Sequence, residues 1–286
     1  NFHLDGLRLD AVHAIVDPTP IPFVQELTAS VHSAAASAGR TALVTIESSA
    51  NDPRIVRPPD LAGWSCDGVW NDDVHHALRV ALTGDRHEYY ANYSGAVDLA
   101  RAWERRWVYS GQYSPGFDRR HGAPADDIDH RRFIVFDTNH DHVGNTPAGA
   151  RLLADAPLDD PRHRLAAAAI LLSPFTPMLF MGEEYGETAP FPYFVDHGDP
   201  ELIEAVRAGR RSEFSGSDWS SEVADPADPA TFAAAVLDPT LAEREPHRSC
   251  LAMYTELLRV RRDAPVLTDP GAQQHVSIVG DTIYDG

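Results

Sequence analysis

The chain has 286 residues, and its 43 Asp and Glu against 24 Lys and Arg give a formal charge of −19. All 24 cations are arginines, which excludes a Schiff-base lysine and the lysine of a phosphate-binding P-loop. So acidic a surface repels nucleic acid and anionic lipid, and no apolar run approaches the roughly 20 residues of a membrane span. We therefore expect neither nucleic acid nor a membrane as a partner, and neutral substrates remain open.

Residues that hold metals or act as nucleophiles do not occur in familiar patterns. The two cysteines, Cys66 and Cys250, lie far apart and form no metal-binding or disulfide framework. Neighbouring histidines such as His75 and His76 project about 100° apart on a helix and do not chelate together easily. No G-x-S-x-G elbow indicates a serine nucleophile. We expect no metal and no cofactor, and the cysteines are compatible with the cytoplasmic location that we expect.

Strand and helix patterns alternate along the chain. It opens on a strand pattern without a signal segment, so we expect a piece of a longer fold. Short apolar runs predict strands at 2–9, 41–47, 67–72, 132–139 and 178–184. Apolar residues spaced three and four apart predict helices over 20–38, 74–82, 97–109, 164–172, 201–210 and 250–262. Residues 110–130 show no period and predict a long loop. The last segment, 275–286, predicts the first hairpin of an all-β module.

Polar side chains follow each predicted strand at the point where the strand ends. They are Asp10, Glu47, Asn71 with Asp72, Asn139 with Asp141, and Glu183 with Glu184. Continuous apolar strands alternating with helices predict a parallel sheet that is covered on both faces. In a TIM-type (β/α)8 barrel, the catalytic residues lie at the carboxyl ends of the strands. Capping of the next helix could explain Asp72, but hardly Glu47, whose next helix is distant. Three carboxylates at strand ends suit hydrolysis of a glycosidic bond.

Several segments resemble the α-amylase superfamily of glycoside hydrolases. DGLRLDAV at 5–12, the isolated Glu47 and NHD at 139–141 occur in the order of three motifs of that superfamily. AVHAI at 11–15, WNDDVHH at 70–76, NHDHVGN at 139–145 and LFMGEEYG at 179–186 resemble one of its groups. The resemblance spans about 1–262 and implies an incomplete barrel with strands four to eight. It places the end of the barrel at residue 266 and the β module at 267–286. Such a piece would leave sheet edges uncovered, so we expect it to be poorly stable and inactive alone.

The resemblance also implies roles for individual residues. Asp10 would be the nucleophile, held ionised and oriented by Arg8, and Glu47 would be the general acid and then the base. Asp141 would bind sugar hydroxyls, with His140 beside it. Because this pair retains configuration, the carboxyl groups of Asp10 and Glu47 should lie about 5–5.5 Å apart. Further contacts to sugar are expected from Trp70, Asn71, Asp72, His75, Tyr113, Asn145 and Glu184.

The group of the superfamily that these segments resemble acts on a neutral α-glucan oligosaccharide. The resemblance implies a retaining glycosidase that cleaves the α-1,4 bond next to the terminal trehalose of a maltooligosyl trehalose, releasing trehalose. Two alternatives stay open: a glucan-transferring member such as a branching enzyme, and a noncatalytic glucan-binding remnant. Around NHD the sequence departs from the superfamily pattern, with Asp137 and Thr138 before the motif and His142 after it. Arg8 and Asp10 could also be only a structural ion pair, and the lone aromatic residues only packing residues.

Overall fold

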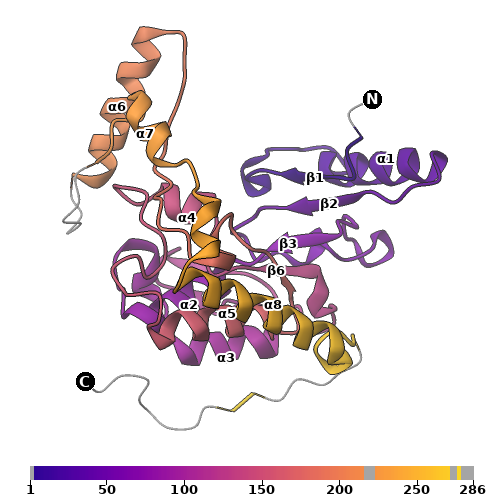
Figure 1. Cartoon of the computed structure of the whole chain (residues 1–286). Helices are drawn as coiled ribbons and strands as arrows, with labels where there is room; N and C mark the ends of the chain where they lie inside the picture. The colour runs from indigo at the N-terminus through magenta and orange to yellow at the C-terminus, as the bar shows by residue number, and fades with distance from the viewer. Residues whose placement is uncertain (1–2, 216–222, 271–275, 278–286) are drawn as a thin grey trace. The chain divides into compact units, whose positions relative to one another are not determined.

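The computed structural model of the chain describes residues 3–215, 223–270 and 276–277 (Figure 1). The chain divides into two compact units. The first unit comprises residues 1–135, 172–178 and 264–286, and the second comprises residues 136–171 and 179–263. None of the helices in the described part of the chain is long and apolar enough to cross a lipid bilayer.

A parallel sheet forms the core of the first unit. Its five strands, hydrogen-bonded in chain order, are β1 (Gly6–Leu9), β2 (Leu43–Ile46), β3 (Gly68–Trp70), β6 (Phe133–Val135) and β7 (Thr176–Pro177). Each of these five strands pairs in parallel with the next one in this order. The side chains of Val44, Ile46, Phe133 and Val135 are completely buried, as the apolar runs predicted. Consecutive parallel strands of this kind are those of part of a β/α barrel, which confirms the predicted fold class.

Helices of both units follow the predicted pattern closely. The first unit contains α1 (Phe23–Ser37), α2 (Asp72–Thr83) and α3 (Ala96–Arg105), and the second contains α4 (His140–Gly144), α5 (Pro161–Leu171), α6 (Pro200–Phe214), α7 (Pro229–Ala234) and α8 (His247–Asp263). Short 3₁₀ turns are η1 (Val12–Ala14), η2 (Pro53–Ile55), η3 (Pro59–Leu61), η4 (Glu88–Asn92), η5 (His130–Arg132), η6 (Glu183–Tyr185), η7 (Pro239–Glu243) and η8 (Pro265–Leu267). α1 ends at Ser37, and Gly39, two residues later, has a φ of +67° that suits glycine. There the N–H groups of Gly39 and Arg40 bond back to the carbonyls of Ala36 and Ala35.

The fifth predicted strand and the predicted loop differ from the structure. The fifth strand is Thr176–Pro177 and not 178–184, because the N–H of Phe180 donates to the Glu183 carboxylate at 2.9 Å instead of to a strand. The loop 110–130 contains an antiparallel pair, β4 (Tyr113–Ser114) and β5 (Arg119–Arg120). The sequence also gave no prediction of the short helices α4 and α7. The terminal hairpin at 275–286 lies outside the described residues except 276 and 277, and the domain boundary at 266 stays a prediction.

The helix predicted over 97–109 ends early because a buried carboxylate takes its last N–H groups. Asp73, which is 5% exposed, accepts hydrogen bonds from the N–H groups of Val108 and Tyr109 at 2.8 and 3.0 Å. It also accepts from the amide of Asn51 and the hydroxyl of Tyr93. Four donors offset the cost of burying one charge. α3 therefore ends at Arg105, and the backbone turns toward Asp73.

One side of the first unit is poorly covered. β1 and β7 are the edge strands of the sheet. α1 buries only Val24 and Thr28 among its residues, while Phe23 on the same helix is 51% exposed and Leu4, ahead of β1, is 65% exposed. An exposed edge strand beside apolar side chains supports the expectation that the chain alone is poorly stable, which stays a prediction.

Candidate active site

The register of the sheet brings the first two predicted carboxylates together. Leu9 of β1 lies opposite Ile46 of β2, so the next residues, Asp10 and Glu47, leave the sheet side by side. The N–H of Glu47 donates to the carbonyl of Leu9 at 2.9 Å, and the N–H of Val12 donates to the carbonyl of Glu47 at 3.1 Å. These two bonds continue the ladder past the strands. The backbone therefore places both carboxylates at the carboxyl end of the sheet, where a β/α barrel has its active site.

A single guanidinium contacts three of the predicted site residues. Arg8, on β1, forms an ion pair with Asp10, and its Nη2 lies 2.9 Å from Oε2 of Glu47. Its Cζ atom also lies 4.3 Å from the centre of the Trp70 ring, a cation–π contact. The residues come from the ends of the three neighbouring strands β1, β2 and β3. The sequence predicted the contact from Arg8 to Asp10 but not those to Glu47 and Trp70.

The backbone after β1 adds a second donor to Glu47. Ala11 has φ +41° and ψ +44°, a left-handed conformation that is unfavourable for a residue with a Cβ atom. In this conformation its N–H donates to Oε2 of Glu47 at 2.8 Å. Backbone strain of this kind concentrates at functional sites. Arg8 and Ala11 thus both contact Oε2, and the side chain of Asp10 is 74% exposed whereas that of Glu47 is 20% exposed.

The other predicted residues of the first unit differ in their exposure. Asn71 is 1% exposed and its amide donates to the Arg106 carbonyl at 2.5 Å, while His75 is completely buried with Nε2 3.2 Å from the Tyr90 hydroxyl. Trp70 is also buried, at 9% exposed. These three side chains lie in the interior of the unit, and the sugar contacts predicted for them stay predictions.

Two predicted contacts of this unit lie nearer the solvent. Asp72 is half-buried in the first turn of α2. Tyr113, on β4, is 55% exposed, and its hydroxyl bonds to the Asp118 carboxylate. Contact of either residue with sugar stays a prediction.

The NHD motif caps a short helix in the second unit. The side chain of Asn139 accepts hydrogen bonds from the N–H groups of Asp141 and His142, both at 3.0 Å, and so begins α4. This leaves the side chain of Asp141 43% exposed, with His140 Nε2 at 3.4 Å from its Oδ1. Asn145 is exposed at the end of α4, and Glu184 is half-buried in η6. Asn139 therefore acts as the N-cap of α4, and the side chains of Asp141 and His140 are exposed to solvent.

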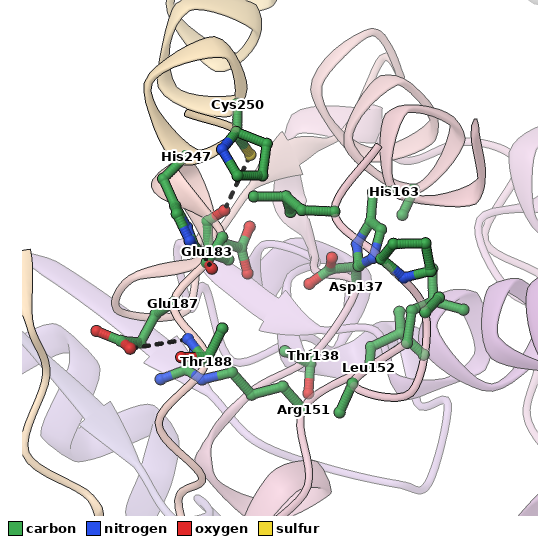
Figure 2. A pocket seen from close by; sticks show the side chains of 18 of the residues that line it. Asp137, Thr138, Arg151, Leu152, His163, Glu183, Glu187, Thr188, His247 and Cys250 are labelled. Atoms are coloured by element: carbon green, nitrogen blue, oxygen red, sulfur yellow. Dashed lines mark hydrogen bonds between the residues drawn. The ribbon is translucent and has the colours of Figure 1, made fainter. Parts of the chain in front are cut away.

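Sequence reasoning missed two features of the second unit. In the first unit it missed that the Asp73 carboxylate accepts hydrogen bonds from the N–H groups of Val108 and Tyr109. Asp137 is buried, and it lines the same pocket as Glu183 and Arg151 (Figure 2). The only signal in the sequence was that Asp137 stands at an unusual place before NHD. No group of three or more His, Cys, Asp or Glu side chains suited to a metal ion occurs within the described ranges.

Comparisons with known proteins agree with this geometry. No family model matches the chain. Over 268 residues it is 44% identical to the malto-oligosyltrehalose trehalohydrolase of Arthrobacter ramosus, covering 93% of the chain and 46% of that protein. Identity to the protein of the same name from Saccharolobus solfataricus is 38%, covering 92% and 43%. A solved structure described as a putative alpha amylase from Salmonella typhimurium superposes with a TM-score of 0.85 at 35% identity, covering 95% of the chain and 46% of that chain.

All of these matches cover similar shares of the chain and of the other protein. The chain spans about half the length of the curated relatives that it matches, while nearly all of the chain itself is covered. The parallel sheet, the order of the motifs and the Salmonella structure point to the same fold. By sequence, nearly the whole chain is similar to about half of the malto-oligosyltrehalose trehalohydrolases, and by fold it is similar to the solved structure described as a putative alpha amylase.

Proposed function

We propose that the chain carries the catalytic carboxylates of a retaining glycosidase that releases trehalose from maltooligosyl trehalose. The bond cleaved is the α-1,4 bond next to the terminal trehalose, and the substrate is a neutral α-glucan oligosaccharide. The observation that carries the proposal is the Arg8 guanidinium, which contacts Asp10 and Glu47 where β1 and β2 end. The relatives named above are called trehalohydrolases, which supports this substrate. Both cysteines are free and buried, which suits the cytoplasm, where we place the reaction.

The proposed chemistry divides between the two carboxylates. Asp10 attacks the anomeric carbon and forms a glycosyl ester as the bond to the trehalose oxygen breaks, while Glu47 donates a proton to that oxygen. Water then attacks the ester, and Glu47 takes the proton of the water. Since Arg8 and Ala11 both contact Oε2 of Glu47, Oε1 is the oxygen placed to carry the proton. Asp10, which accepts from Arg8 and is more exposed, is the carboxylate that the substrate can reach.

Asp141 and His140 of the second unit are the residues that we propose to bind sugar hydroxyls. Both are exposed on α4, and their hydroxyl-binding groups suit the sugar ring as it flattens in the transition state. Among the other predicted contacts, Asp72, Tyr113, Asn145 and Glu184 have exposed or half-buried side chains and are the ones that we retain.

A hybrid protein tests the function. In it, the 268 matched residues of the Arthrobacter ramosus relative are replaced by those of this chain. We expect the hybrid to release trehalose from maltotriosyl trehalose and little sugar from maltopentaose, whereas the chain alone should release none. Trehalose is measured by chromatography, and the unaltered relative serves as the positive control. New branch linkages in place of trehalose would indicate a branching enzyme, and glucan binding without any product would indicate a noncatalytic remnant. Either result would contradict the proposal.

A further inference from the structure

Trp70 ends β3 at the level where the two neighbouring strands present Asp10 and Glu47. The strands β1, β2 and β3 are in register, and the last row of residues aligned across them is followed by Asp10, Glu47 and Trp70. Side chains alternate along a strand, so Arg8, two positions before Asp10, lies on the same face of the sheet. An indole ring therefore completes the row whose other two members are the proposed catalytic carboxylates.

The Arg8 guanidinium lies over this indole ring. Its Cζ atom is 4.3 Å from the ring centre, well inside the distance of about 6 Å at which a cation is attracted to an aromatic face. Trp70 is 9% exposed and the side chain of Arg8 is 26% exposed, so little water competes for the cation. Tryptophan is the strongest of the aromatic partners, and the attraction grows when water is excluded. The contact is therefore stronger than one on the open surface.

The ring and the two carboxylates contact different parts of the guanidinium. Nη1 of Arg8 is paired with Asp10, and Nη2 lies 2.9 Å from Oε2 of Glu47. The N–H groups of a guanidinium point outward in its plane, so carboxylates bind at the edge, while an aromatic ring attracts the flat face. Trp70 thus adds a contact that neither carboxylate can supply. It limits the movement of a long side chain that two ion pairs at the edge would leave free to tilt.

The contact with Trp70 also differs from the other two because the proposed reaction leaves it unchanged. Asp10 loses its negative charge when it forms the glycosyl ester and regains it when water cleaves that ester. Glu47 changes charge at the same two steps, since it first gives up a proton and later takes one. Both partners at the edge of Arg8 therefore change charge in every turnover. The indole ring does not ionise, and it attracts the cation equally in each state.

We propose that Trp70 is a positioning residue, whose ring keeps the Arg8 guanidinium between Asp10 and Glu47 while these two carboxylates change charge. This inference rests on the proposed function. It differs from the sugar contact predicted from the sequence, because here Trp70 acts through Arg8 and not by stacking on a glucose ring. The two roles differ in their kinetics: loss of a positioning contact lowers kcat, whereas loss of a stacking surface for the sugar raises KM.

Fluorinated tryptophans at position 70 of the hybrid protein test this role. Fluorine draws electrons from the face of the ring and weakens its attraction for a cation, while the indole keeps nearly the same shape and packing. Cleavage of the α-1,4 bond in maltotriosyl trehalose is the rate measured. We expect kcat to fall step by step as fluorine atoms are added, by roughly tenfold in total, the rate equivalent of an ordinary cation–π contact. KM should stay within about twofold, because the ring does not act on the substrate directly.

Two controls show whether the effect passes through Arg8. Trp107 lies in the same unit, is 1% exposed, and packs edge-on against Phe133 with the ring centres 5.0 Å apart. The same fluorinated residues at position 107 should leave kcat within about twofold, because the attraction that fluorine weakens is to a cation. Arg8→Gln removes the guanidinium and should itself lower kcat. In this variant the series at position 70 should change kcat by less than about twofold, as a double-mutant cycle requires when two residues act together.

Four results would overturn the inference. They are a kcat that fluorination at position 70 leaves unchanged, a KM that rises instead, an equal fall in kcat from fluorination at position 107, and a fall that persists in Arg8→Gln. Bond cleavage is counted whichever product forms, so a hybrid that makes branch linkages still tests Trp70. Failure of the proposed function is seen in the unmodified hybrid, and failure of this inference in the comparison between the fluorinated series. A hybrid that cleaves no glucan would contradict both.

Discussion

Asp10→Asn in the hybrid protein is expected to lower the rate of trehalose release by a factor on the order of 10⁴ or more, the loss typical of removing a nucleophile. An amide cannot form the glycosyl ester, yet it has nearly the same shape as the carboxylate and can still accept a hydrogen bond from Arg8. Binding of the glucan should therefore change little while turnover disappears. Single-turnover trehalose release and glucan binding, measured on the same preparation, check both parts.

Asp5→Asn is the matched control for this variant. Asp5 precedes the same strand, and its exposed side chain pairs with Arg40 at the other end of β1. The same change of charge should leave trehalose release within about twofold, because exposed ion pairs contribute little. A comparable loss in both variants, or turnover that survives in Asp10→Asn, would contradict the role of Asp10.

Glu47→Gln should lower trehalose release by about 10²- to 10⁴-fold, the usual contribution of a positioned general acid. The glutamine oxygen can still accept from the N–H of Ala11 and lie beside the Arg8 guanidinium, so the local structure should be kept. The amide cannot deliver a proton to the leaving oxygen. A substrate whose leaving group needs no proton, such as 4-nitrophenyl α-maltotrioside, should therefore form the glycosyl ester in the variant almost as fast as in the unaltered hybrid. Burst kinetics with this substrate provide the measurement.

Equal losses with both substrates would show that Glu47 supports the structure of the site and does not act as the acid. Glu26→Gln, on the exposed side of α1, is the control for the change of charge and should leave both rates unchanged.

Much of the first unit could be predicted from its sequence because local patterns determine it. The apolar run ending at Glu47 produces a strand whose Val44 and Ile46 side chains are buried on one face, and the residues after such strands meet at one edge of the sheet. The positions of Asp10 and Glu47 beside each other follow from this. The contact of Arg8 with Glu47 and Trp70 depends on the register between strands, which no local pattern reveals.

What the sequence did not predict depends on contacts between residues that are far apart in the sequence. α3 ends before its apolar pattern does because Asp73, more than 30 positions earlier, takes the N–H groups of Val108 and Tyr109. The hydrogen bond from the Asn71 amide to the carbonyl of Arg106 likewise joins distant positions and could not be read from the strand pattern. Asp137 and Glu183 line one pocket although they lie 46 positions apart, which could not be predicted from either segment alone.

The anomer that the hybrid protein forms first tests most directly whether Asp10 and Glu47 are a retaining pair. Proton NMR during the first minutes of maltotriosyl trehalose cleavage identifies the configuration of the new reducing end before mutarotation. Two successive displacements, by Asp10 and then by water, predict the α anomer first, followed by slow equilibration. Initial release of the β anomer would mean a single displacement by water, and Asp10 would then not be the nucleophile.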